Sequence, residues 1–118
     1  GTDALGVLLM GHARGAYWYG SMLDIETTRA LCPHNNATSL QVTASVMSGV
    51  IWAMRNPARG ILEPDELPHR EIMEWCAPYL GNMVGVYTDW TPLQGRGWLM
   101  DEAVEAGDPW QFGNFRVT

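Results

Sequence analysis

The chain contains no lysine and none of the short motifs that commonly mark an enzyme site. Its seven cations are all arginine, against 13 carboxylates, so a binder of nucleic-acid phosphates, which relies on clustered basic residues, is disfavoured. Glycine-rich nucleotide loops, the Gly-x-Ser-x-Gly elbow, and the Cys-x-x-Cys and His-Glu-x-x-His motifs do not occur. We therefore expect no nucleic-acid partner and no metal site.

Long apolar runs and paired cysteines are also scarce. The longest apolar stretch, Val42 to Met54, is interrupted by polar residues and is shorter than the roughly 18 residues that cross a bilayer. No basic segment followed by an apolar core opens the sequence, so we expect a cytoplasmic protein with no membrane segment. Cys32 and Cys76 have no metal-ligand spacing, and we expect both to be free, buried thiols.

The residues that are present predict one globular domain organised around a central helix at 38–55. The chain has 118 residues, of which 47% are hydrophobic and 17% are charged. This composition is typical of globular proteins that form a hydrophobic core. Thr38 and Gln41 fit a capping box at the start of this helix, and Asn56-Pro57 ends it. The apolar arc is wide enough that we expect the helix to be covered on most sides. Its main stripe consists of Leu40, Ala44, Met47, Ile51 and Met54.

A β-hairpin at 7–23 precedes the central helix. The run 7–10 is predicted to be a buried strand, and Gly15 is free to take the positive φ of a turn before the second strand. Asp24 is placed to cap a short helix that ends near Leu31. After the central helix, a second long helix is expected at 66–80, with Pro68 tolerated in its first turn.

A third short strand at 83–87 and an irregular aromatic tail at 88–118 complete the predicted fold. The tail carries five large aromatic rings, so we expect it to pack across a surface. The fold class is thus an α+β fragment, with a hairpin and a third short strand packed against about three helices. The tail rings are Trp90, Trp98, Trp110, Phe112 and Phe115.

Two aromatic clusters offer the main chemical hint in the residues themselves. Tyr17-Trp18-Tyr19 and Tyr87-Thr88-Asp89-Trp90 place aromatic rings and a carboxylate where they could bind an ammonium group by cation–π attraction and charge pairing. Core packing of the rings and a turn-forming role for Asp89 explain the same residues. The residues alone therefore indicate a cation-binding α+β module without fixing a reaction.

Several longer motifs resemble bacterial homospermidine synthase, in order and nearly from end to end. Homospermidine synthases belong to the saccharopine dehydrogenase-like group, whose fold is related to α/β dehydrogenases. The motifs that carry the resemblance are Gly15-Ala16-Tyr17-Trp18-Tyr19-Gly20-Ser21, Asn36-Ala37-Thr38-Ser39-Leu40-Gln41-Val42, Asn56-Pro57-Ala58-Arg59-Gly60, Pro78-Tyr79-Leu80-Gly81, Val84-Gly85-Val86-Tyr87-Thr88-Asp89-Trp90-Thr91-Pro92-Leu93 and Asp108-Pro109-Trp110-Gln111-Phe112.

The resemblance implies an NAD-dependent transferase of polyamine biosynthesis. In the family's reaction NAD accepts hydride from putrescine, ammonia leaves the resulting imine, a second diamine attacks, and the hydride returns to give homospermidine. The match covers roughly the last quarter of a family member. The N-terminal dinucleotide-binding domain, which would hold NAD, is therefore expected to be absent, and the isolated chain to be inactive.

The same resemblance suggests a use for the wide apolar arc of the central helix. One face would pack within this segment and another against the absent domain, so we expect an exposed apolar patch and a homo-oligomer such as a dimer. Two other interpretations remain open: a different saccharopine dehydrogenase-like enzyme, such as a carboxynorspermidine-type reductase, or a stand-alone interaction or regulatory module.

Five residues are candidates for the site of the whole enzyme. By the resemblance, Asp3 is the one acid placed to lie near the substrate. Tyr17, Trp18, Asn36 and Thr38 match its motifs and could face the substrate or cofactor cleft. Structural roles in the sheet and in the helix cap are the competing explanation for these four residues.

Overall fold

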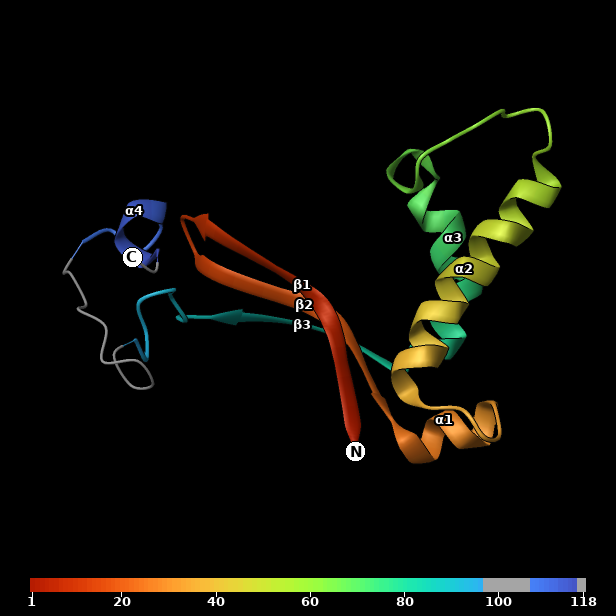
Figure 1. The fold of residues 1–118 in the computed structure, drawn as a ribbon, viewed down its shortest axis with the longest axis horizontal. Coiled ribbons are helices and arrows are strands. Elements are labelled where there is room, and N and C mark those ends of the chain that lie inside the picture. The colour runs from red at the N-terminus through yellow and green to blue at the C-terminus, as the bar shows by residue number, and fades with distance from the viewer. Residues whose placement is uncertain (97–106, 117–118) are drawn as a thin grey trace. The chain divides into compact units, whose positions relative to one another are not determined.

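The structure, a computed structural model, describes residues 1–96 and 107–116 (Figure 1). Trp98, one of the predicted packing rings of the tail, lies outside this range. The strands are β1 (Thr2–His12), β2 (Gly15–Asp24) and β3 (Asn82–Thr88), and the helices are α1 (Ile25–Leu31), α2 (Ala37–Arg55), α3 (His69–Cys76) and α4 (Phe112–Phe115). No helix in the described part of the chain is long and apolar enough to cross a membrane.

The three strands form one antiparallel sheet in the order β1-β2-β3. This arrangement of a hairpin, a third strand and about three or four helices confirms the predicted α+β fold class. The hairpin begins earlier than the predicted 7–23, because β1 already starts at Thr2. Its turn is as predicted, with Gly15 at a φ of +85°. The chain divides into two compact units, one of residues 1–6 and 20–84 and the other of residues 7–19 and 85–118.

In the first unit, α1 and α2 begin at polar side chains that satisfy free backbone N–H groups. Asp24 caps α1 by accepting hydrogen bonds from Thr27 N at 2.7 Å and Thr27 Oγ1 at 2.9 Å, which confirms its predicted role. Asn36 caps α2, since its Oδ1 accepts from Ser39 N at 2.8 Å. The predicted Thr38–Gln41 capping box is wrong, because the extended backbone that a cap requires occurs at Asn36, two residues before Thr38.

The core of the first unit is small and lies between β2 and the start of α2. Leu23 is fully buried and packs with Ala37 and Leu40, while Cys32 and Tyr79 cover this cluster. Burying a leucine side chain contributes about 1.5–3 kcal/mol. Both cysteines are free, with Cys76 buried and Cys32 only partly so.

Helix α2 packs against α3, and of its predicted apolar stripe only Leu40 and Ala44 are fully buried. Gln41, Ser48 and Trp52 are buried, whereas Met47 and Met54 are exposed. Small Ser48 allows close packing at the helix surface, and its Oγ donates to Ala44 O. The expectation that α2 is covered on most sides is wrong for the described residues. Its exposed valines are Val42, Val46 and Val50.

The second long helix is shorter than the predicted 66–80. Helix α3 covers only His69–Cys76, with a single 3-10 turn on each side, at Pro64–Glu66 and at Ala77–Tyr79. Pro68 is the N-cap of α3, with an extended backbone, so it precedes the first turn in which it was expected. Pro78 sits in the second 3-10 turn and stops α3 from continuing.

A tight reversal at Gly81 leads from the 3-10 turn into β3. Gly81 has a φ of +70°, a conformation that residues with a side chain rarely adopt. A Cβ atom there would overlap Met22 O of the neighbouring strand. The third strand can therefore start beside β2 only because residue 81 has no side chain.

The second unit contains the end of the hairpin, most of β3 and the C-terminal segments. The run 7–10, predicted to be a buried strand, is exposed along its whole length. A continuous apolar run predicts cover on both faces, but β1 is an edge strand with only β2 as a neighbour. In the described part of the tail, Trp110 and Phe115 are partly buried and Phe112 is exposed. Trp110 Cβ lies close to Gly11, at 4.0 Å from the position a Cβ there would occupy.

Candidate functional site

Asp3 belongs to a buried polar network in the first unit. The carboxylate is partly buried on β1, and its Oδ2 lies 2.8 Å from the side-chain amide of Gln41 on α2. The other atom of that amide meets Ser21 Oγ on β2. Gln41 and Ser21 are only 1% and 4% exposed. Three elements, β1, β2 and α2, therefore meet at one chain of hydrogen bonds.

The orientation of the Gln41 amide follows from its neighbours. Asp3 Oδ2 and Ala37 O are both acceptors, at 2.8 and 3.3 Å from the same amide atom, so that atom must be the nitrogen, which carries two hydrogens. The oxygen then faces Ser21 Oγ, which donates to it. Within the described residues, no buried side-chain nitrogen or oxygen lacks a hydrogen-bond partner.

Two more predicted site residues lie at the start of α2. Asn36 is the N-cap and Thr38 is in the first turn, and both are exposed. Gln41 connects this turn to Asp3, since its amide also reaches Ala37 O. The structure thus brings Asp3 to the first turn of α2. The observed role of Asn36 is that of a cap, and no hydrogen bond within residues 1–96 and 107–116 gives the Thr38 side chain a comparable one.

Tyr17 and Trp18, the other two predicted site residues, belong to the second unit. Tyr17 packs on Tyr87 of β3, with ring centroids 4.6 Å apart. It also covers Gly85, where any side chain would overlap its ring. Trp18 is partly buried. The two aromatic clusters thus contact each other through these rings, and the guanidinium of Arg14 lies over the Tyr87 ring at 3.6 Å.

A shallow depression of about 520 Å³ opens beside this ring pair. Asp89 places a carboxylate in it, close in sequence to Thr88, whose Oγ1 accepts a hydrogen bond from Trp90 N at 3.1 Å. The side chains around the depression provide one cation, one carboxylate, three hydroxyls and two aromatic rings. Its lining consists of Arg14, Gly15, Tyr87, Thr88, Asp89, Thr91 and Trp110.

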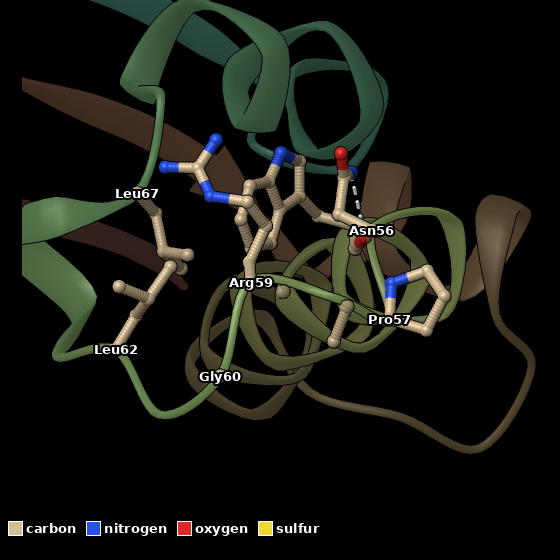
Figure 2. A pocket seen from close by; sticks show the side chains of 9 residues that line it. Asn56, Pro57, Arg59, Gly60, Leu62 and Leu67 are labelled. Carbon is tan, nitrogen blue, oxygen red and sulfur yellow. Dashed lines mark hydrogen bonds between the residues drawn. The ribbon is translucent and has the colours of Figure 1, made fainter.

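A second cavity, of about 340 Å³, lies at the C-terminal end of α2 (Figure 2). The Asn56-Pro57-Ala58-Arg59-Gly60 motif forms one wall, and Arg59 lies 5.7 Å from the Trp52 ring. Trp52 is held by its Nε1, which donates to Glu71 Oε2 on α3 at 3.2 Å. Asn56 Nδ2 donates to Trp52 O at 2.9 Å and closes the helix end. Of these contacts, only the Trp52–Glu71 hydrogen bond joins α2 to α3.

The described residues provide no site for a metal or for a dinucleotide. No group of three or more His, Cys, Asp or Glu side chains among them could hold a metal ion. A pyrophosphate cradle needs a glycine-rich turn between a strand and a helix N-terminus. Helix α2 instead follows the His34-Asn35-Asn36 loop, which has no glycine, and Asn36 already occupies Ser39 N. The start of α2 therefore provides no cradle for the pyrophosphate of NAD.

Sequence reasoning missed the two residues that hold Asp3. Gln41 falls on the polar arc of the predicted helix, and its position suggested a capping box rather than a buried bridge. Ser21 lies on a strand between Gly20 and Met22, with no local pattern to mark it. A long amide on an otherwise apolar helix is the one available signal, since a buried amide must find partners.

Comparison with known proteins gives a consistent result for this segment. No known protein-family profile matches the chain. It is 56% identical over 117 residues to homospermidine synthase of Blastochloris viridis and 50% identical over 117 residues to that of Mesorhizobium japonicum. Each match covers 99% of this chain and 24% of the relative.

A solved structure shows the same relationship. The crystal structure of the homospermidine synthase from Legionella pneumophila in complex with NAD matches with a TM-score of 0.87 and 58% sequence identity. The match covers 99% of this chain and 26% of that one. These similarities confirm the predicted resemblance: the chain is similar to a segment of homospermidine synthase and spans about a quarter of the length of the relatives it matches.

Proposed function

We propose that the chain is the C-terminal part of an NAD-dependent homospermidine synthase of the saccharopine dehydrogenase-like group. The whole protein would transfer an aminobutyl group between two putrescine molecules, giving homospermidine and ammonia. The observation that carries this proposal is sequence identity of 50–56% to two homospermidine synthases across nearly the whole chain. The fold supports it independently, with a TM-score of 0.87 to an NAD-bound homospermidine synthase.

NAD would be held by the rest of the full-length protein. When bound, it supplies the hydride acceptor and donor of the reaction. The described residues have no pyrophosphate cradle, so they cannot place the nicotinamide against a substrate. The 118-residue chain alone should therefore be inactive, although its own residues contribute to the site.

The contribution we assign to this segment is a carboxylate for a protonated amine. Putrescine carries two ammonium groups at neutral pH, and Asp3 offers it a partly buried anion. Hydrogen bonds among the described residues engage only Oδ2 of Asp3, so Oδ1 can accept from a substrate ammonium group. Such charge-assisted hydrogen bonds are stronger than neutral ones. Asn36 and Thr38, at the start of α2 in the same unit, would then support this part of the site rather than react.

Cellular context and assembly complete the proposal. We place the whole enzyme in the cytoplasm as a homo-oligomer, with a dimer as the simplest assembly. The exposed valines of α2 support the need for a further packing partner, because an apolar face of this kind is seldom left in water.

The test is an assay of the full-length protein with putrescine, with and without NAD. Homospermidine and ammonia are expected only when NAD is present, and no product is expected from the 118-residue chain in either condition. Formation of a carboxylated polyamine from other substrates would favour a carboxynorspermidine-type reductase. Absence of any coupled amine product would remove the synthase assignment.

A further inference from the structure

We propose that Gln41 is a positioning residue, which holds the Asp3 carboxylate in place for a protonated amine of the substrate. This inference rests on the proposed function and adds a residue to its site. Gln41 is on the central helix α2 and is 1% exposed, so it has no access to the substrate itself. It acts through Asp3.

The geometry leaves the Gln41 amide no alternative orientation. Its two N–H hydrogens are directed to Asp3 Oδ2 at 2.8 Å and to Ala37 O at 3.3 Å, and its oxygen accepts from Ser21 Oγ. Rotating the amide by half a turn would set its oxygen against two acceptors. The N–H group that meets Asp3 is therefore fixed from two sides, by the backbone of α2 and by β2.

Packing alone does not explain a glutamine at this position. Burying an amide is costly unless each polar atom finds a partner, and an apolar side chain of similar length would fill the same space. The amide gives the segment a donor that reaches across from α2 to β1. Because that donor is directional, it selects one rotamer of Asp3.

A neutral donor also preserves the charge that the substrate needs. Arginine or lysine at position 41 would pair with Asp3 and compete with an incoming ammonium group. An amide orients the carboxylate and leaves its full negative charge in place. Oδ1 of Asp3 then remains available to accept from the diamine, while Oδ2 stays on Gln41.

The experiment uses the full-length enzyme with bound NAD and compares Gln41→Met with Ser48→Ala. Methionine keeps the length of the side chain and removes the N–H donor. Ser48 is the matched control, because it is also fully buried on α2 and its hydrogen bond to Ala44 O is far from Asp3 in the hydrogen-bond network. Steady-state kinetics with putrescine and NAD affinity are measured for each variant, alone and combined with Asp3→Asn.

We expect Gln41→Met to raise KM for putrescine and lower kcat/KM by roughly 10-fold to 100-fold, the range for losing a hydrogen bond to a charged group. NAD affinity should not change, and Ser48→Ala should keep wild-type kinetics. In the Asp3→Asn background, Gln41→Met should cause no further loss, since residues that act through one another are not additive. Should Gln41→Met fail to fold, Ser21→Ala takes its place with the same expectation.

Three results would overturn the inference while leaving the synthase assignment intact. They are wild-type kinetics for Gln41→Met, an additive loss in the Asp3→Asn background, and wild-type kinetics for Asp3→Asn itself. A wild-type enzyme that forms no homospermidine with NAD present would instead remove both the function and this role of Gln41.

Discussion

The guanidinium carbon of Arg14 lies 3.6 Å from the centre of the Tyr87 ring. The same ring contacts Tyr17 at 4.6 Å and His12 edge-on at 6.3 Å between centroids. Tyr87, one of the rings that the sequence suggests for an ammonium ligand, thus already contacts a cation of its own chain. An external amine would have to displace Arg14 to reach that face of Tyr87.

Replacing Arg14 should weaken the second unit modestly. A cation over an aromatic ring contributes about 0.5–1 kcal/mol at an exposed site, so Arg14→Ala should lower the free energy of unfolding by that amount in urea titrations. Arg14→Lys keeps the charge and should lose less. If alanine and wild type unfold at the same urea concentration, the stacked pair contributes no stability.

Two variants at the start of α2 should differ in their effect on stability. Asn36→Ala removes the side-chain oxygen that accepts from Ser39 N and should cost about 1 kcal/mol of stability, as lost N-caps do. Thr38→Ala changes an exposed first-turn residue and should stay within about 0.5 kcal/mol of wild type. Thermal unfolding of both variants checks this. A larger loss for Thr38→Ala would restore the capping box expected from the sequence.

Asp24 should make stability depend on acid pH. Hydrogen bonds from the Thr27 backbone N–H and hydroxyl hold the pKa of Asp24 below its ordinary value of 3.8. Because the pKa of Asp24 is lower in the folded state, its carboxylate stabilises the fold at pH values above 3.8. This stabilisation is lost as the pH falls below 3.8 and through the pKa of the folded state. Unfolding measured between neutral and strongly acid pH should show less of this loss in Asp24→Asn than in wild type. An identical acid profile for the two proteins would contradict it.

The exposed valines of α2 should make the isolated chain self-associate. Val46 and Val50 are 61% and 53% exposed, and apolar surface of this kind is usually covered by a partner. Light scattering should show a mass that rises with concentration, and Val46→Ser with Val50→Ser should reduce it. Thr43→Ser, on the exposed part of the same helix, serves as the control. A constant monomer mass at high concentration would argue against association through α2.

Local chemistry was readable from the sequence. Asp24 and Gly15 could be placed because a cap and a turn depend on their immediate neighbours, and the resemblance to homospermidine synthase rests on contiguous motifs. The order of the three strands and of α1, α2 and α3 followed from similar signals, whereas α4 lies in the tail that was predicted to be irregular. Proline positions were visible too, although their effect was underestimated: Pro68 and Pro78 confine α3 to His69–Cys76.

Tertiary partners were not readable in this way. Trp52 is buried, and Glu71 on α3 accepts its indole N–H. The sequence of neither helix indicates that the two residues are partners. Gln41 is polar on a helix wheel, yet its partners come from two strands. The apolar run 7–10 predicts a covered strand, whereas its actual cover depends on where β1 sits in the sheet. In all three examples burial depends on contacts between segments far apart in the sequence. The hydrophobic periodicity of a single segment does not indicate which segment it will contact.

Gly81 sets a limit on how this segment can change. The backbone of β2 passes so close that the reversal at residue 81 has room for a hydrogen and nothing larger. The connector around Ile61, which is wholly exposed, can accept insertions and substitutions. At Gly81, where the chain enters β3, neither an inserted residue nor a larger side chain can be accommodated. Sequence changes should therefore be frequent in the connector before α3 and rare at Gly81, after α3.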